Sequence, residues 1–72
     1  MTLLDTLRRR ELTRPPASAE IRRAAGASQL DVARELGVGR ETVARWELGM
    51  RAPRGELRDR YAALLEGLAT RR

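Results

Sequence analysis

Apolar residues recur at intervals of three and four between Ser28 and Gly49, which is the spacing of a buried helix face. These positions are Val32, Ala33, Leu36, Val43 and Trp46. The break Gly37-Val38-Gly39 divides them into two short runs. Because glycine readily adopts the left-handed conformation in which helices often end, the pattern predicts a helix, a tight turn and a second helix.

The start of the first predicted helix carries a capping signal. Ser28 is the candidate N-cap, and Asp31 three residues later completes an aspartate version of the capping box. Gly39 is placed to cap the second helix. Two helices joined by such a short turn form a helix-turn-helix, whose second helix fits the major groove of DNA.

A leucine stripe predicts an earlier helix over residues 2–12, with Thr2 as its cap. Its leucines fall within about 100° of a helical wheel, so one face is expected to be covered. They are Leu3, Leu4 and Leu7. Arg14-Pro15-Pro16 ends this helix, since the residue before a proline is pushed out of helical geometry. The basic run at residues 8–10 is interpreted either as the solvated helix end or as an arm that contacts DNA.

Two further segments have helical patterns. Residues 18–25 predict a short helix with Ser18 as its cap and Gly26 as its stop. Residues 56–68 predict the longest helix, with an apolar stripe on one face. The stripe consists of Leu57, Tyr61, Leu64, Leu65 and Leu68.

These segments together predict an all-α fold, a compact bundle of four to five short helices. Residues 1–14 are interpreted as an N-terminal helix and linker, and residues 15–72 as the helix-turn-helix domain with its C-terminal helix. The expected core is Ile21, Val32, Ala33, Leu36, Val43, Trp46, Leu57, Tyr61 and Leu64.

Composition narrows the function. Fifteen arginines and no lysine, against ten acidic residues, give a net charge of +5 and predict attraction to polyanions. Exclusive use of arginine is also typical of a GC-rich genome, so only the net charge is used as evidence. The chain has no cysteine and no histidine, so an enzyme is disfavoured and no metal or cofactor is expected. No apolar run is long enough for a signal peptide or membrane span, so a cytoplasmic, nucleoid-associated protein is expected.

A helix over residues 40–48 places Val43 and Trp46 on one side, where they are expected to pack in the core. The opposite side is expected to contact bases. It carries Arg40, Glu41, Ala44 and Arg45. The arginines are suited to guanine or to phosphates at the groove edge, and Ala44 to a thymine methyl. Glu41 is interpreted either as an acceptor for a cytosine amino group or as a residue that favours the helix N-terminus.

Three further positions are expected to contact phosphates. Gln29, in the first turn of its helix, can offer its amide and backbone N–H, although an ordinary polar role at that position is the alternative. Arg51 and Arg54 lie in the loop that follows the second helix. They are interpreted as phosphate contacts or as solvated loop charges.

The stretch from Ile21 to about Leu64 resembles the Cro/C1-type (XRE-like) helix-turn-helix domains of phage and bacterial repressors. In that family a Ser-Gln opens the second helix, and an alanine follows four residues after the glutamine. A glycine makes the turn, and Trp-Glu-x-Gly followed by a proline closes the third helix. The matching residues are Ser28, Gln29, Ala33, Gly37, Trp46, Glu47, Gly49 and Pro53.

The resemblance implies a lambda-repressor-like bundle that binds double-stranded DNA, usually as a homodimer on a palindromic site. It places the base contacts on Arg40, Glu41, Ala44 and Arg45, and a phosphate contact on Gln29. It also implies a structural ion pair between Arg22 and Glu47. Arg54 resembles a position that approaches the minor groove.

The resemblance implies a departure from the family pattern after residue 68, where we expect no counterpart of the family's fifth helix, a common dimerisation element. We therefore expect the N-terminal leucines to pack against Leu64, Leu65 and Leu68, within one chain or across two. The function predicted is a small Cro-like repressor of phage or mobile-element type that acts by occupying an operator. An antitoxin-like autoregulator, or a module that binds a protein partner, is the alternative.

Overall fold

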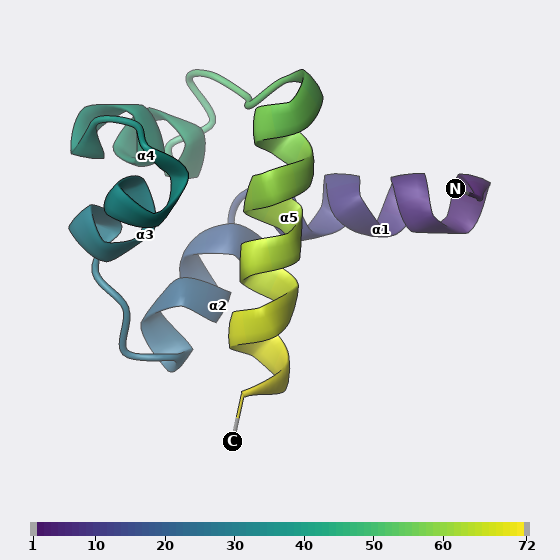
Figure 1. The fold of residues 1–72 in the computed structure, drawn as a ribbon, viewed down its shortest axis with the longest axis horizontal. Coiled ribbons are helices and arrows are strands. Elements are labelled where there is room, and N and C mark those ends of the chain that lie inside the picture. The colour runs from purple at the N-terminus through teal and green to yellow at the C-terminus, as the bar shows by residue number, and fades with distance from the viewer. Residues whose placement is uncertain (1, 72) are drawn as a thin grey trace.

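The computed structural model describes residues 2–71, which form five helices joined by short turns (Figure 1). The helices are α1 (Leu3–Thr13), α2 (Ala17–Ala24), α3 (Gln29–Leu36), α4 (Arg40–Glu47) and α5 (Gly55–Thr70). The described residues contain no strand, which confirms the predicted all-α class. Met1 and Arg72, the outer ends of the two predicted segments, lie outside the described residues.

Helix α5 is the centre of the bundle, because α1, α2 and α3 all pack against it. Figure 1 shows α5 upright, with α3 and α4 to one side of it and α1 running away on the other. The fully buried cluster between these elements is Val32, Ala33, Leu36, Val43, Trp46, Tyr61 and Leu65. Among the expected core residues, Ile21, Leu57 and Leu64 are only partly buried and pack against this cluster.

Local sequence signals explain where α3 begins and ends. The Ser28 side chain accepts a hydrogen bond from the Asp31 N–H, and the Asp31 carboxylate accepts one from the Ser28 N–H. These bonds lower the pKa of Asp31. Gly37 ends the helix in the left-handed conformation, with φ at 71°. The predicted capping box and glycine stop are therefore confirmed.

The prediction that Ser18 caps the second helix is wrong. Helix α2 begins one residue earlier, at Ala17, with Pro16 at its N-cap, and Ser18 is completely buried inside it. Proline suits a helix start because its fixed φ is compatible with helical geometry. Ser18 lies beside the buried hydroxyl of Tyr61, where its small side chain allows α2 to pack on α5.

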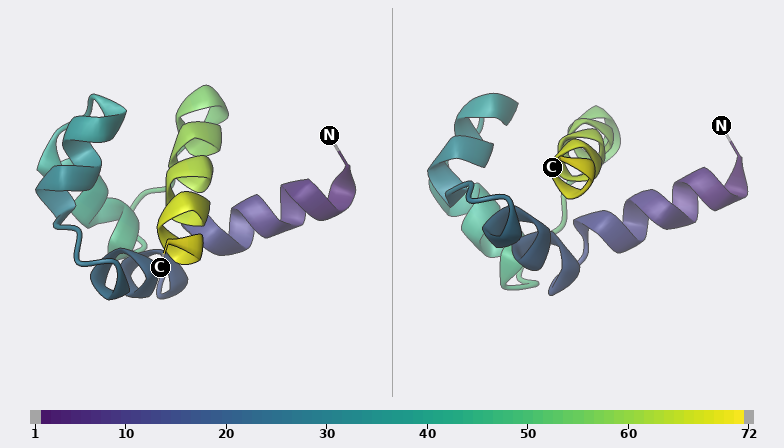
Figure 2. Two further views of the ribbon diagram at one scale, coloured as in Figure 1. Left: turned by 60° about the horizontal axis from the view of Figure 1, so that its bottom comes forward. Right: turned by 90° about the horizontal axis from the view of Figure 1, so that it is seen from below.

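The N-terminal leucines are predicted to pack against the leucines of α5, within one chain or across two, and within this chain Leu3 and Leu4 are not covered. Leu3 is 72% exposed and Leu4 77% exposed. Only the second half of α1 crosses α5, where Leu12 packs against the core and Thr13 is buried. The first half of α1 projects beyond the bundle (Figure 2), so within residues 2–71 Leu3 and Leu4 remain largely uncovered and Leu7, at 40% exposed, is partly covered.

Candidate nucleic-acid interface

Helix α4 lies with one face in the core and the other in solvent. Val43 and Trp46 are buried, whereas Arg40, Glu41 and Arg45 are exposed. Ala44, on the same side as these polar residues, is half-buried. The exposed side of α4 therefore combines long polar side chains with the short side chain of Ala44. Because Ala44 is small, the backbone of α4 can approach the major groove of DNA closely at this position.

The orientation of α4 is fixed by an aromatic pair. The rings of Trp46 on α4 and Tyr61 on α5 have centroids 4.8 Å apart and are tilted by 39°. Offset and tilted ring pairs of this kind stabilise a structure beyond the area they bury. Burial of Tyr61 raises the pKa of its hydroxyl. Because α5 is the central helix, this contact ties α4 to the rest of the bundle.

A bidentate ion pair joins α2 to the end of α4. Arg22 Nε donates to Glu47 Oε2 at 2.6 Å, and Arg22 Nη2 donates to Glu47 Oε1 at 2.9 Å. The two side chains are only 11% and 6% exposed. Arg22 Nη1 also donates to the Ala27 carbonyl at 2.9 Å, so one guanidinium holds the turn before α3 and the end of α4 together.

The electrostatics of this pair favour both charges. Burial alone would raise the pKa of Glu47, but hydrogen bonds from Arg22 and Gln29 outweigh it and hold the pKa below its ordinary value. The hydrogen bonds to Glu47 likewise raise the pKa of Arg22. Both groups stay ionised in the folded protein at neutral pH.

Gln29 extends the network to the exposed face of α4. Its Nε2 donates to Glu47 Oε1 at 3.0 Å, and its Oε1 accepts from Arg40 Nη1 at 3.1 Å. The side-chain amide thus connects Glu47, at the end of α4, with Arg40, at its start. Gln29 therefore orients a predicted base-contacting arginine, in addition to lying at the first turn of α3.

A groove of about 1260 Å³ starts beside α4, follows the turn between α4 and α5, and reaches the end of α1. Arg45, Arg51 and Arg54, three of the predicted DNA contacts, line it. Arg10, Arg14 and Arg58 also line it. Sequence reasoning assigned no DNA contact to Arg14 or Arg58, and left Arg10 open as part of a basic run. For Arg14 and Arg58 the net charge was the only signal in the sequence, because the end of α1 and the start of α5 come together through folding alone.

The remaining predicted contacts lie outside this groove. Gln29, Arg40, Glu41 and Ala44 are absent from its lining.

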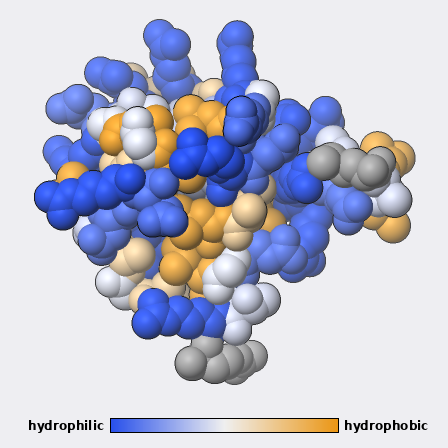
Figure 3. All heavy atoms as spheres, viewed as in Figure 1, coloured by the Kyte–Doolittle hydropathy of each residue, from blue (hydrophilic) through white to orange (hydrophobic). Residues whose placement is uncertain are grey.

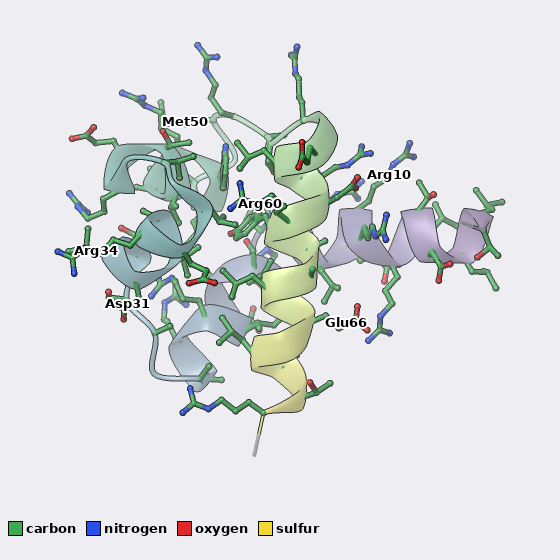
Figure 4. All side chains as sticks on the ribbon, viewed as in Figure 1. Arg10, Asp31, Arg34, Met50, Arg60 and Glu66 are labelled. Carbon is green, nitrogen blue, oxygen red and sulfur yellow. The ribbon has the colours of Figure 1, made fainter. Side chains whose placement is uncertain are left out.

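Hydrophilic side chains project from the upper edge of the molecule in Figure 3. Figure 4 places Met50 and Arg10, both of which line the groove, on this upper part of the molecule at opposite sides of α5.

Within residues 2–71, no group of three or more potential metal-binding side chains comes together. The helices of this part of the chain are too short or too polar to cross a membrane.

A family model described as helix-turn-helix matches residues 19–66, which is more than half of the chain. The match includes α3, α4, and most of α2 and α5, and it leaves α1 outside. Comparison with curated proteins and with solved structures gives no match.

Proposed function

Since the chain belongs to the Cro/C1-type helix-turn-helix family of DNA-binding transcription regulators, we propose that it recognises a specific double-stranded DNA sequence through α4. The observation that carries this proposal is that one face of α4 is buried in the core and the opposite face is exposed. Its apolar face is held by the Trp46–Tyr61 contact and by Glu47, while its polar face is open. A major groove admits a helix presented in this way.

The proposed base contacts are Arg40, Glu41, Ala44 and Arg45, and the proposed phosphate contacts are Gln29, Arg51 and Arg54. The Gln29 amide is already bonded to Glu47 and Arg40, so its contribution is to hold Arg40 and to present the first turn of α3 to a phosphate. We further propose that the protein represses by occupying an operator, at the nucleoid in the cytoplasm, as small phage or mobile-element repressors do.

A second candidate function is the binding of a protein partner, as in an antitoxin-like autoregulator. Leu48 and Met50, at the end of α4, are 72% and 69% exposed and offer an apolar contact. The remainder of the exposed α4 surface is polar and rich in arginine, whereas a protein interface has apolar anchors at its centre. DNA is therefore the better-supported ligand.

We also propose a homodimer on DNA, in which a second copy covers the leucines of α1. A helix of 11 residues is marginal in water unless tertiary packing supports it. The exposed apolar side chains at the free end of α1 are visible in Figure 3. In sedimentation equilibrium, the wild type should dimerise and a Leu3→Ser/Leu4→Ser variant should remain a monomer. A wild type that stays monomeric at all concentrations and on DNA would exclude this arrangement.

Selection of binding sites from random duplexes tests the main proposal. A single enriched operator is expected. Arg45→Ala should weaken binding to it by about 1–3 kcal/mol and relax one base position, whereas Arg51→Ala should weaken all sequences alike. Steeply salt-dependent binding without any enriched sequence would leave only a basic surface and would contradict sequence-specific regulation.

A further inference from the structure

The groove beside α4 concentrates positive charge from several parts of the chain. Arg45 comes from α4, Arg51 and Arg54 from the following turn, and Arg58 from the first turns of α5. At the far end, Arg10 and Arg14 come from α1 and the turn after it. None of the described residues that line the groove is acidic.

The arginines of α1 and of the turn after it fall into two groups that differ in their partners. Arg8 lies 3.4 Å from Glu66, and Arg9 lies 3.5 Å from Asp59, so each has a carboxylate beside it. Among the described residues, Arg10 and Arg14 form no ion pair, and both are exposed. The side of α1 that faces the groove therefore keeps its charge, while the side toward α5 is compensated.

We propose that this groove binds the sugar-phosphate backbone of the duplex flanking the bases contacted by α4, with Arg10 and Arg14 as its outer phosphate contacts. The inference rests on the proposed function, because it places the duplex against α4. It adds a contact from α1, which lies outside the region matched to the family.

Continuity with α4 is the reason to choose a DNA backbone over another polyanion. Thr42 and Arg45 belong both to α4 and to the groove lining. A duplex that meets Arg45 therefore continues past Arg51 and Arg54 toward the end of α1. The groove is also much larger than a single phosphate, and arginine suits successive phosphates because its planar fork donates to two oxygens at once.

The salt dependence of duplex binding tests this inference. Arg10→Ala/Arg14→Ala is compared with the wild type and with Arg8→Ala/Arg71→Ala, which removes two arginines from outside the groove lining. Equilibrium binding is measured against salt on a random duplex and on the selected operator. Melting temperatures establish that the variants are folded, and Arg10→Lys/Arg14→Lys tests whether charge alone suffices.

We expect the groove variant to lower the magnitude of the slope of log K against log [salt] by about 2, or about 1 for each arginine. When salt is raised from 50 to 200 mM, the factor by which affinity falls should be about tenfold smaller for the groove variant than for the wild type. The lysine variant should keep most of the slope, and the control variant should keep nearly all of it.

Equal slopes for the groove variant and the wild type would overturn the inference. The inference would also be overturned if binding of a polyglutamate peptide, and not binding of the duplex, depended on Arg10 and Arg14. The groove would then be a site for an acidic peptide. If an operator is found whose binding requires Arg45, but the groove variant has the same salt slope as the wild type, only this inference is overturned and the proposed function stands. A reduced slope without any operator would support the groove contact while contradicting sequence-specific regulation.

Discussion

Helices α1 and α3 begin with the same local structure and end in different environments. Each starts with a reciprocal capping box, made by Thr2 and Asp5 in α1 and by Ser28 and Asp31 in α3. Helix α3 then buries its apolar face against α4 and α5, whereas the first half of α1 leaves Leu3 and Leu4 in solvent. A capping box therefore specifies where a helix begins, and it does not specify whether the apolar stripe that follows is covered.

The same two regions differ in their ion pairs. The Arg22–Glu47 pair that supports the helix-turn-helix is bidentate and nearly buried, whereas the Arg8–Glu66 pair that links α1 to α5 is a single contact at 3.4 Å, with side chains 59% and 49% exposed. Removing one member of a buried pair leaves an uncompensated charge with little access to water. An exposed ion is well hydrated with or without its partner. The tertiary position, and not the residue types, sets the strength of each pair.

The largest expected effect is that of breaking the buried pair. Glu47→Ala should lower the free energy of unfolding by about 3 kcal/mol, the lower end of the range for buried pairs, because Arg22 retains some contact with solvent. Urea unfolding followed by Trp46 fluorescence measures this. A loss below about 1 kcal/mol would mean that the pair behaves like a surface pair, and the contrast between the two regions would fail.

The pH dependence of stability should identify the same pair. The pKa of Glu47 is lowered on folding from an ordinary value of 4.5, so the unfolded chain binds this proton more readily. Its contribution to stability is therefore fully present above that value, and it is lost as the pH falls through the lower pKa of the folded state. Asp31 acts in the same direction. Urea unfolding between pH 3 and 7 (roughly the range in which carboxylates titrate) should give a flatter profile for Glu47→Gln than for the wild type, and parallel profiles would contradict this assignment.

A smaller effect is expected at the turn between α3 and α4. Gly37→Ala should cost about 1 kcal/mol, because Gly37 has a φ of 71° that residues with a Cβ rarely adopt. Gly67→Ala is the matched control, since Gly67 lies inside α5, where an added Cβ would point into open space. The control should stabilise the protein by about 0.5–1 kcal/mol through helix propensity. Thermal unfolding shifts of the same sign for both variants would be the contrary result.

The smallest expected effect is that of breaking the pair on α1. Arg8→Ala should change the free energy of unfolding by less than about 0.5 kcal/mol, since both partners are largely exposed. Measurement at low and high salt completes the comparison with Glu47→Ala, because an exposed pair is screened and a buried one is screened much less. A loss near that of Glu47→Ala would show that the contact between α1 and α5 is stronger than the exposure of Arg8 and Glu66 indicates.

Local signals in the sequence were sufficient for most of the fold. The caps at Thr2 and Ser28, the left-handed glycine at residue 37 and the apolar spacing around Trp46 each act over a few residues, and the structure has all of them. The prediction that Ser18 caps a helix was wrong, also for a local reason. A serine at the start of a helix has the chemistry of a cap, and only the packing of α2 on α5 shows that its small size is what matters.

The sequence by itself therefore determined the helices, the turn between α3 and α4, and which face of α4 carries Arg40 and Arg45. Tertiary structure alone decided that Gln29 bridges Glu47 and Arg40, that the first leucines of α1 stay uncovered, and that Arg10 and Arg14 share a groove with Arg45. The physical reason is the range of the interactions. Caps, glycine conformation and helical periodicity act within one or two turns of the chain. The groove and the hydrogen-bond network join side chains from segments distant in sequence, which come together only once α5 has packed against its neighbours.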